Sequence, residues 1–231
     1  MKKVLMVVYS FPPLKDAGSE RSAEFVKQLP SCGWDPIVLT RDVRTQYETD
    51  PKMSVPKGVD IIRTNPWEPE YLPKFLHSVG KALSSLLIPD EERLWELFAV
   101  RKAIRLAKNN GVDLVYTVSP PSSAHIIGLR LKKKYPSIPW VADICKPVPN
   151  KKGIKDHYEQ RLERRIVLGA DCVISGNEAV YESLQTLNAD SPLPEAFTYV
   201  SDGNVQLLSE QFEKACRAIA AEKIGNSGSE T

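Results

Sequence analysis

The chain has 231 residues, of which 42% are hydrophobic and 26% are charged, as is ordinary for a globular protein with one large core or two small ones. Lysine and arginine number 31 against 29 acidic residues, and the resulting net charge of +2 argues against a protein that binds nucleic acid through its overall charge. Four scattered cysteines, without a CxxC pair or ligand-like spacing to the three histidines, predict reduced thiols and no metal site.

The amino terminus imitates a signal peptide, because Met1-Lys2-Lys3 precedes an apolar run over residues 4–8. The run is short and is broken by Ser10 and Pro12-Pro13, so we interpret it as a first buried strand. No segment has the length of a membrane span. We therefore expect a cytoplasmic protein, and contact with the inner face of the membrane stays open.

Short apolar runs alternate with longer helical patterns along the chain, which predicts an α/β fold: a Rossmann-like, doubly wound parallel sheet of about seven strands flanked by helices. The predicted strands are Val4–Tyr9, Pro36–Leu39, Val59–Arg63, Leu114–Thr117, Trp140–Asp143, Cys172–Ser175 and Thr198–Val200. Helices are predicted over residues 19–29, 70–88 and 91–109, after Pro121, around Leu162, around Leu184, and over 205–224. A polar tail, residues 225–231, is expected to be disordered.

Two turns that leave predicted strands are the most informative local features. One runs from Phe11 to Gly18 and the other from Ser119 to His125. In open α/β sheets, ligands bind outside the carboxyl ends of the strands, so these turns predict a face for a polar, phosphorylated ligand. The first lacks the GxGxxG pattern, which disfavours an NAD-linked oxidoreductase. Gly18 at a helix amino terminus would let backbone N–H groups hold an anion, although an ordinary helix entry also fits.

Several motifs in the same order resemble the amino-terminal domain of the group-1 (family 4) glycosyltransferases, over residues 1 to about 203. They are Tyr9-Ser10-Phe11-Pro12-Pro13, Ala17-Gly18, Gly33-Trp34-Asp35-Pro36, Pro89-Asp90-Glu91, Asp113-Leu114-Val115-Tyr116, Ser119-Pro120-Pro121, Ala124-His125, Pro139-Trp140-Val141-Ala142-Asp143 and Ala170-Asp171-Cys172-Val173-Ile174. The resemblance implies one half of a GT-B fold, in which two Rossmann-like domains face each other across a cleft. It also implies hexosyl transfer from a nucleotide sugar to an acceptor with retention at the anomeric carbon, in polysaccharide or glycolipid synthesis and without a cofactor.

The same resemblance implies site residues. Gly18 matches the second glycine of a pair that approaches the donor diphosphate, and Ala17 replaces the first. His125 matches a PP-x-x-AH motif near the reacting sugar, and Asp143 matches the first acid of a motif usually written D-F-R-D-P-W. The implied catalytic residues are therefore His125 and Asp143. The implied substrate- and phosphate-binding residues are Ala17, Gly18, Arg21, Ser119, Pro120 and Lys146.

Plainer interpretations of these residues stay open. His125 also fits a helix-start histidine that is exposed or bonded to backbone, and Arg21 fits a helix-surface arginine. The segment after Asp143 reads Ile144-Cys145-Lys146-Pro147-Val148, and its three departures from the family motif, one of which reverses a charge, argue against an intact site.

The end of the similarity suggests how the chain is organised. Ser201-Asp202-Gly203-Asn204 resembles the hinge between the two GT-B domains, and too few residues follow for a donor-binding domain. We expect an acceptor-side domain over 1–203, a terminal helix over 204–224 that packs back on it, and the tail.

Two hypotheses follow, and a third is that the chain is a fragment of a longer enzyme. In the first, the chain is inactive alone and transfers sugar once another chain supplies the donor domain; its ligands are then a nucleotide sugar and a sugar or lipid-linked acceptor. In the second, it is a non-catalytic binding or assembly module. A protein partner or homodimer fits both.

Basic clusters at 132–134, 151–155 and 161–165 fit either solvated helix ends or a rim facing anionic lipid or a phosphorylated substrate. The apolar stripe over 72–87 fits a core helix or a helix on the membrane surface.

Overall fold

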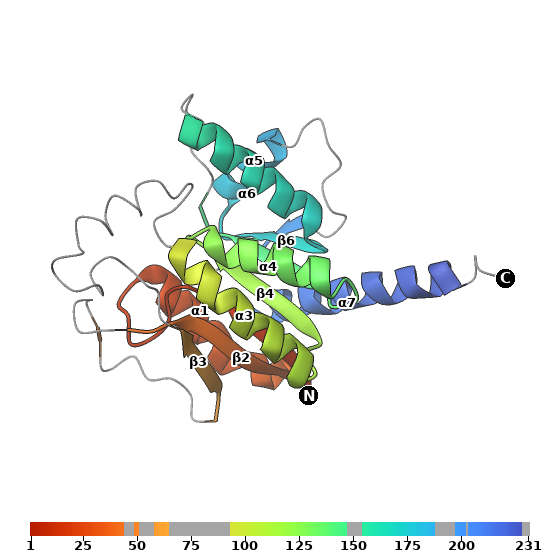
Figure 1. Ribbon diagram of the computed structural model, residues 1–231, viewed down its shortest axis with the longest axis horizontal. Coiled ribbons are helices and arrows are strands. Elements are labelled where there is room, and N and C mark those ends of the chain that lie inside the picture. Colours follow the sequence, from red (N-terminus) through yellow and green to blue (C-terminus); the bar gives the residue numbers. More distant parts are fainter. Residues whose placement is uncertain are drawn as a thin grey trace.

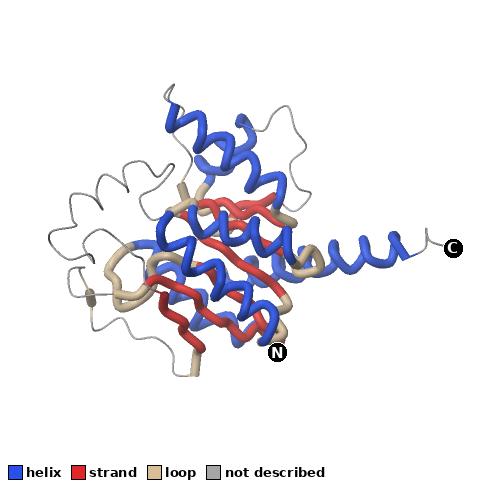
Figure 2. The backbone as a smooth tube through the Cα atoms, in the orientation of Figure 1, coloured by secondary structure: helices blue, strands red, loops and turns tan. Residues whose placement is uncertain are grey.

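A sheet of seven parallel strands forms the centre of the computed structural model, which describes residues 1–43, 49–50, 58–64, 93–146, 154–187, 197–201 and 203–227. The strands are β1 (Lys2–Val7), β2 (Trp34–Arg41), β3 (Asp60–Thr64), β4 (Leu114–Ser119), β5 (Trp140–Ile144), β6 (Cys172–Ser175) and β7 (Phe197–Tyr199). Their order across the sheet is β3-β2-β1-β4-β5-β6-β7. Figures 1 and 2 show the strands in the middle of the molecule, with helices around them. All seven predicted strands are confirmed, and none of their bounds shifts by more than two residues.

Helices cover both faces of this sheet. Those in the described residues are α1 (Ala17–Gln28), the short 3-10 helix η1 (Leu29–Cys32), α3 (Arg93–Asn109), α4 (Ser123–Lys134), α5 (Ile154–Gly169), α6 (Glu178–Leu187) and α7 (Val205–Ser227). The helix predicted over 70–88 lies outside the described residues. The terminal helix continues three residues beyond the predicted end, to Ser227, and residues 228–231 of the expected tail lie outside the described residues.

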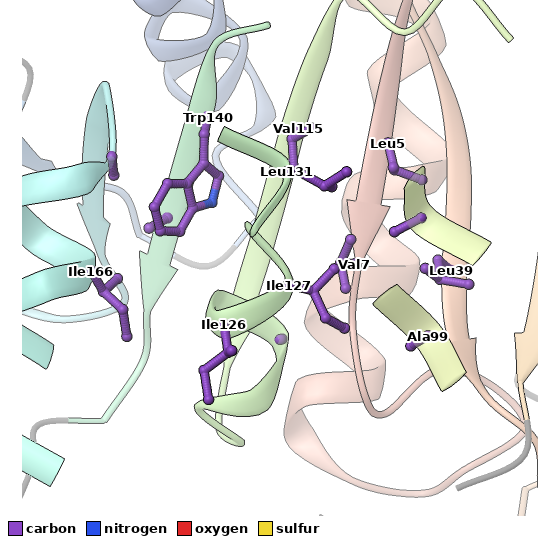
Figure 3. Packing of buried hydrophobic residues seen from close by; sticks show 14 of the residues in the cluster. Leu5, Val7, Leu39, Ala99, Val115, Ile126, Ile127, Leu131, Trp140 and Ile166 are labelled. Carbon is purple, nitrogen blue, oxygen red and sulfur yellow. The ribbon is translucent and has the colours of Figure 1, made fainter. Parts of the chain in front are cut away.

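The alternation of side chains along each strand divides the core into two clusters. Leu5, Val7, Leu39 and Val115 face α3 and α4, where they meet residues such as Ala99, Ile127 and Leu131 (Figure 3). Val4, Met6, Val38 and Tyr116 face the other way, toward α1, η1 and α7. We call these the α3–α6 face and the α1–α7 face. Because both are covered by helices, the strands are apolar on both sides.

Close packing of α4 depends on a glycine. A Cβ atom added to Gly128 would lie 2.4 Å from the indole ring of Trp140, on the neighbouring strand β5. The absence of a side chain therefore lets α4 lie directly on the sheet.

The helix α7 lies across the α1–α7 face. Phe212 is fully buried and packs edge-on against Trp34, with ring centroids 5.2 Å apart. Ser209 Oγ accepts a hydrogen bond of 3.2 Å from Trp34 Nε1, and Lys2 pairs with Glu213 at 2.6 Å. The far end of the helix projects from the body of the protein (Figure 1).

The strand order also marks where ligands bind in folds of this kind. From β1 to β3 the chain adds strands toward one edge of the sheet, and from β4 to β7 it adds them toward the other edge. The order therefore reverses between β1 and β4, which are adjacent in the sheet although β2 and β3 lie between them in sequence. In open α/β sheets, the crevice outside the carboxyl ends of two such strands is the usual ligand site. The turn after β1 leads to α1 and the turn after β4 leads to α4, so both predicted turns lie at this edge.

Candidate functional site

Residues from both turns are found at the carboxyl edge of β1, β4 and β5. Ala17 and Gly18 are exposed in the first turn of α1, Pro120 is exposed just after β4, and Lys146 is exposed just after β5. Ser119, the last residue of β4, is buried, and its carbonyl accepts a hydrogen bond of 3.2 Å from the Cys145 N–H. Of the predicted site residues, those exposed at this edge are thus two at a helix amino terminus, a proline and a lysine.

The first turn of α1 already carries a negative group. Asp16 caps the helix: its carboxylate accepts a 2.8 Å hydrogen bond from the Ser19 N–H, and its carbonyl accepts one of 3.0 Å from Glu20. A Cβ atom on Gly18 would lie 3.3 Å from Asp16 Oδ1. The first N–H groups of a helix have no partner within the helix and attract anions. An anion at Ala17 and Gly18 would nevertheless lie beside the Asp16 carboxylate, and the two negative charges would repel each other.

A buried ion pair lies beneath this edge. Arg21 Nη2 donates to Asp143 Oδ2 at 2.8 Å, and only 7% of the Arg21 side chain and none of the Asp143 side chain is exposed. The Tyr116 hydroxyl donates to the same carboxylate oxygen at 2.5 Å, and Arg21 also lies 3.5 Å from the Val200 carbonyl. The cluster therefore joins α1 to β4, β5 and the end of the sheet beyond β7.

Burial and charge set the protonation states in this cluster. Burial alone would lower the pKa of Arg21, but its polar neighbours, first among them the Asp143 carboxylate, together raise it. Burial raises the pKa of Tyr116 well above its ordinary value, and the negative charge of Asp143 adds to the effect. At neutral pH the tyrosine is therefore a neutral donor and the arginine a cation, both directed at one carboxylate.

His125 lies in a neutral hydrogen-bond network on the opposite face. Its Nδ1 atom is 2.7 Å from Thr117 Oγ1, and the same oxygen accepts a bond of 2.9 Å from Trp140 Nε1. The Thr117 oxygen accepts from the indole N–H, and the direction of its bond with Nδ1 is set by the tautomer of the histidine. His125 is 1% exposed, and burial lowers its pKa to about 3, more than the nearby backbone of Asp143 raises it. The imidazole is consequently uncharged at neutral pH.

The side chains of the two residues expected to be catalytic do not meet, although the His125 ring lies close to the Asp143 backbone. Along β4 and β5, Thr117 is paired with Ala142 and Val118 with Asp143, so Thr117 and Asp143 point to opposite faces. His125 follows Thr117 to the α3–α6 face, whereas Asp143 lies among Tyr116, Val118 and Arg21 on the α1–α7 face. The sheet separates their side chains. Within the described part of the chain, Arg21 and Asp143 are the only two predicted site residues that form an ion pair with each other.

Three partners of these residues were not predicted. They are Tyr116, which bonds to Asp143, Thr117, which bonds to His125, and Trp140, which bonds to Thr117. The sequence does carry a weak signal for Tyr116. Side chains alternate between the two faces along a strand, so once β4 and β5 are known to be neighbours, Tyr116 and Asp143 are expected on the same face. Nothing in the sequence marks Thr117 as a partner of His125.

The described residues lack a metal-binding cluster and a membrane-spanning helix. They contain no group of three or more histidine, cysteine, aspartate or glutamate side chains able to hold a metal ion. None of the described helices is both long enough and apolar enough to cross a membrane.

Comparison with known proteins agrees with the resemblance seen in the sequence. Residues 17–194 match the model of the family described as "Glycosyl transferase 4-like domain". Among solved structures, the chain is similar to MurG from Acinetobacter baumannii, with 12% identity, a TM-score of 0.39, and coverage of 93% of this chain and 71% of that one. No curated protein matches the chain. Since the family match spans most of the sequence, the chain belongs to the glycosyl transferase 4-like domain family.

Proposed function

We propose that the chain is the acceptor-side half of a retaining, nucleotide-sugar-dependent sugar transferase of polysaccharide or glycolipid synthesis. The observation that carries this proposal is the family match over residues 17–194, which includes Ala17 and Gly18 at the end of the turn after β1 and the whole turn after β4. Family membership supports sugar transfer in general. The retaining outcome and the biosynthetic role rest on the motif resemblance. The site would then act in the cytoplasm, where nucleotide sugars are available.

The donor side of the reaction requires a second nucleotide-binding domain. The described residues form a single sheet, with α7 packed on it, so we propose an acceptor domain over 1–203 with a terminal helix from 204. Stabilisation of a departing diphosphate is normally a large part of the catalysis of group transfer. We propose that a partner chain supplies the donor domain and that the isolated chain transfers little or no sugar.

The exposed residues of the edge are the ones able to touch substrate. Ala17 and Gly18 offer backbone N–H groups, Lys146 offers a cation, and Ser119 with Pro120 shapes the turn between them. Arg21 and Asp143 are buried beneath, and His125 is buried on the far side. We therefore assign these three a positioning role in which they hold the turns, and we reserve direct contact for the exposed group.

The experiment is a reconstitution of full-length protein with a donor-domain partner, radiolabelled UDP- or GDP-sugars and a lipid-linked acceptor. Product with the anomeric configuration of the donor, identified by NMR, supports the proposal, and an inverted product contradicts its mechanism. Lys146→Gln should raise the KM for a phosphorylated acceptor several-fold, since one charge contact to an anion is lost. Lys27→Gln, which also removes an exposed lysine, should leave the KM unchanged.

A second candidate function rests on the segment after Asp143. Cys145 and Lys146 stand where the family motif has an arginine and an acid, and Cys145 Sγ lies 3.6 Å from Asp143 Oδ1. These changes favour a binding or assembly module without catalysis, including a homodimer. If the chain is such a module, its melting temperature should not change when UDP- or GDP-sugars are added, with or without a donor-domain protein. A shift only in the presence of that protein favours the split enzyme.

A further inference from the structure

One surface of the molecule carries exposed charge of a single sign. The helices α3, α4 and α5 lie side by side over the sheet, with α4 in contact with both of the others (Figure 1). Every exposed charged side chain that the structure describes on these three helices is basic: Arg101, Lys102, Arg105, Lys108, Arg130, Lys133, Lys134, Arg161, Arg164 and Arg165. We call this set the basic surface.

Acidic residues of the same helices are withdrawn from that surface. Glu96 is 1% exposed and pairs with Arg130 at 2.6 Å, and Glu163 is 5% exposed. Asp156 and Glu159 are half-buried on α5. On the opposite side, exposed charges of both signs occur: Glu20 and Lys27 on α1, and Glu210, Lys214, Arg217 and Glu222 on α7. The helix α6, which packs on the same face of the sheet as α3, α4 and α5, carries the exposed acids Glu178 and Glu182. Beneath a net charge of only +2, the exposed positive charge is therefore concentrated on α3, α4 and α5.

Exposed apolar side chains border the basic surface. Leu97 and Phe98 on α3 are 51% and 41% exposed, and Tyr158 and Leu168 on α5 are 38% and 51% exposed. Basic side chains beside large apolar ones are the combination that binds the interface of an anionic bilayer, where the charges meet lipid headgroups and the apolar groups enter the region beneath them. A row of helices also offers a broad surface, unlike the concave pocket that a small phosphorylated ligand needs.

We propose that the basic surface docks the protein on an anionic lipid bilayer. The inference deepens the proposed function, because a lipid-linked acceptor would then be presented at the edge where α3, α4 and α5 begin. Four of the basic residues lie on one side of α3, because residues three or four positions apart share a side of a helix. They are Arg101, Lys102, Arg105 and Lys108. The apolar pair Leu97 and Phe98 precedes them, nearer to the site.

The test is flotation of full-length protein with vesicles of phosphatidylcholine containing 30% phosphatidylglycerol, beside vesicles of phosphatidylcholine alone. We expect binding to the first at 50 mM NaCl, loss at 500 mM, and none to the second. Each basic side chain near such a surface contributes roughly a five-fold factor to partition. Replacing Arg101, Lys102, Arg105 and Lys108 by glutamine should therefore reduce partition by more than ten-fold.

The matched control is a quadruple glutamine variant of Lys15, Lys27, Lys214 and Arg217. These exposed residues lie on α1, the turn before it and α7, so the control loses the same net charge from the other side. It should keep at least half of the wild-type partition. Equal losses in the two variants, binding to uncharged vesicles, or equal affinity for single-stranded RNA in solution would each overturn the proposal.

A second measurement uses the unaltered protein and is independent of variant folding. Amine acetylation followed by mass spectrometry should show vesicle-dependent protection of Lys102, Lys108, Lys133 and Lys134, and none at Lys15, Lys27 and Lys214. Uniform protection would contradict a specific surface. Sugar transfer to a short, water-soluble acceptor analogue separates the two proposals, because the α3 variant should keep that activity. Loss of transfer with retained vesicle binding would count against the proposed function alone.

Discussion

The two faces of the sheet bury polar side chains at the same level of β4 and β5, but they do so differently. On the α1–α7 face, a carboxylate is buried with an arginine and a tyrosine directed at it. On the α3–α6 face, an imidazole is buried with a hydroxyl and an indole, and no member of that network is charged at neutral pH. One face is held by charge pairing and the other by neutral hydrogen bonds and tight packing.

This difference shows how a single strand edge can be fixed from both sides. Arg21 connects α1 to β5, so the turn after β1 is held to the middle of the sheet. His125 connects α4 to β4, so the turn after β4 is held by its own strand. Charge pairing is costly to break from one side only, whereas neutral bonds are lost more cheaply. The two faces should therefore respond to substitution and to pH with different magnitudes.

Removing the cover of the α1–α7 face should have the largest effect. Deleting residues 205–231 exposes the apolar partners of Leu208, Phe212, Ala215 and Ile219, all of which are buried. Each large apolar side chain contributes about 1.5–3 kcal/mol by burial, and a domain is stable by only about 5–15 kcal/mol. We expect an aggregating product in size-exclusion chromatography. A chain that stops after Glu222 should stay monodisperse, and a soluble, cooperatively melting 1–204 protein would contradict the prediction.

Breaking the buried ion pair comes second. Asp143→Asn removes the buried carboxylate that Arg21 faces, and removing one partner of a buried ion pair typically costs about 3–5 kcal/mol. Urea denaturation measures the loss. Glu213→Gln is the control, because it breaks the Lys2–Glu213 pair, whose side chains are 48% and 33% exposed. A pair exposed to that extent contributes about 0–1 kcal/mol. Similar losses in both variants would show that Arg21 and Asp143 gain little from each other.

The sequence predicted the strands well because each is a short apolar run bounded by turn residues. Cys172–Ser175 has the predicted bounds, and Trp140–Ile144 extends one residue further. The partnership of Arg21 with Asp143 was not predictable, since 122 positions separate them and the contact depends on how α1 is rotated over the sheet. The burial of His125 was equally hidden. Residues 123–128 of α4 are all buried, so no narrow apolar stripe shows which way the histidine points.

Tight packing on the α3–α6 face gives the third prediction. Gly128→Ala places a Cβ atom 2.4 Å from the Trp140 ring, which is fixed by its bond to Thr117. Overpacking of this kind costs about 1–3 kcal/mol. Gly169→Ala is the control, since its Cβ would meet Leu129 Cδ2 at 2.9 Å and the Trp140 ring only at 3.6 Å. The end of a leucine can move aside, so the control should be nearly neutral. Equal melting temperatures of the two variants would argue against close contact of α4 with Trp140.

The smallest effect concerns His125 and pH. Because burial lowers its pKa from 6.5 to about 3, the unfolded chain binds a proton in this range that the folded protein does not. The stability it confers is present in full above pH 6.5 and falls as the pH drops toward 3, by up to about 1.4 kcal/mol per unit. His125→Gln removes this titration. Its stability deficit in urea at pH 7 should therefore shrink by about 1 kcal/mol at pH 5.5. A deficit that stays constant or grows would mean that the imidazole is charged in the folded protein, and the neutral network on the α3–α6 face would have to be abandoned.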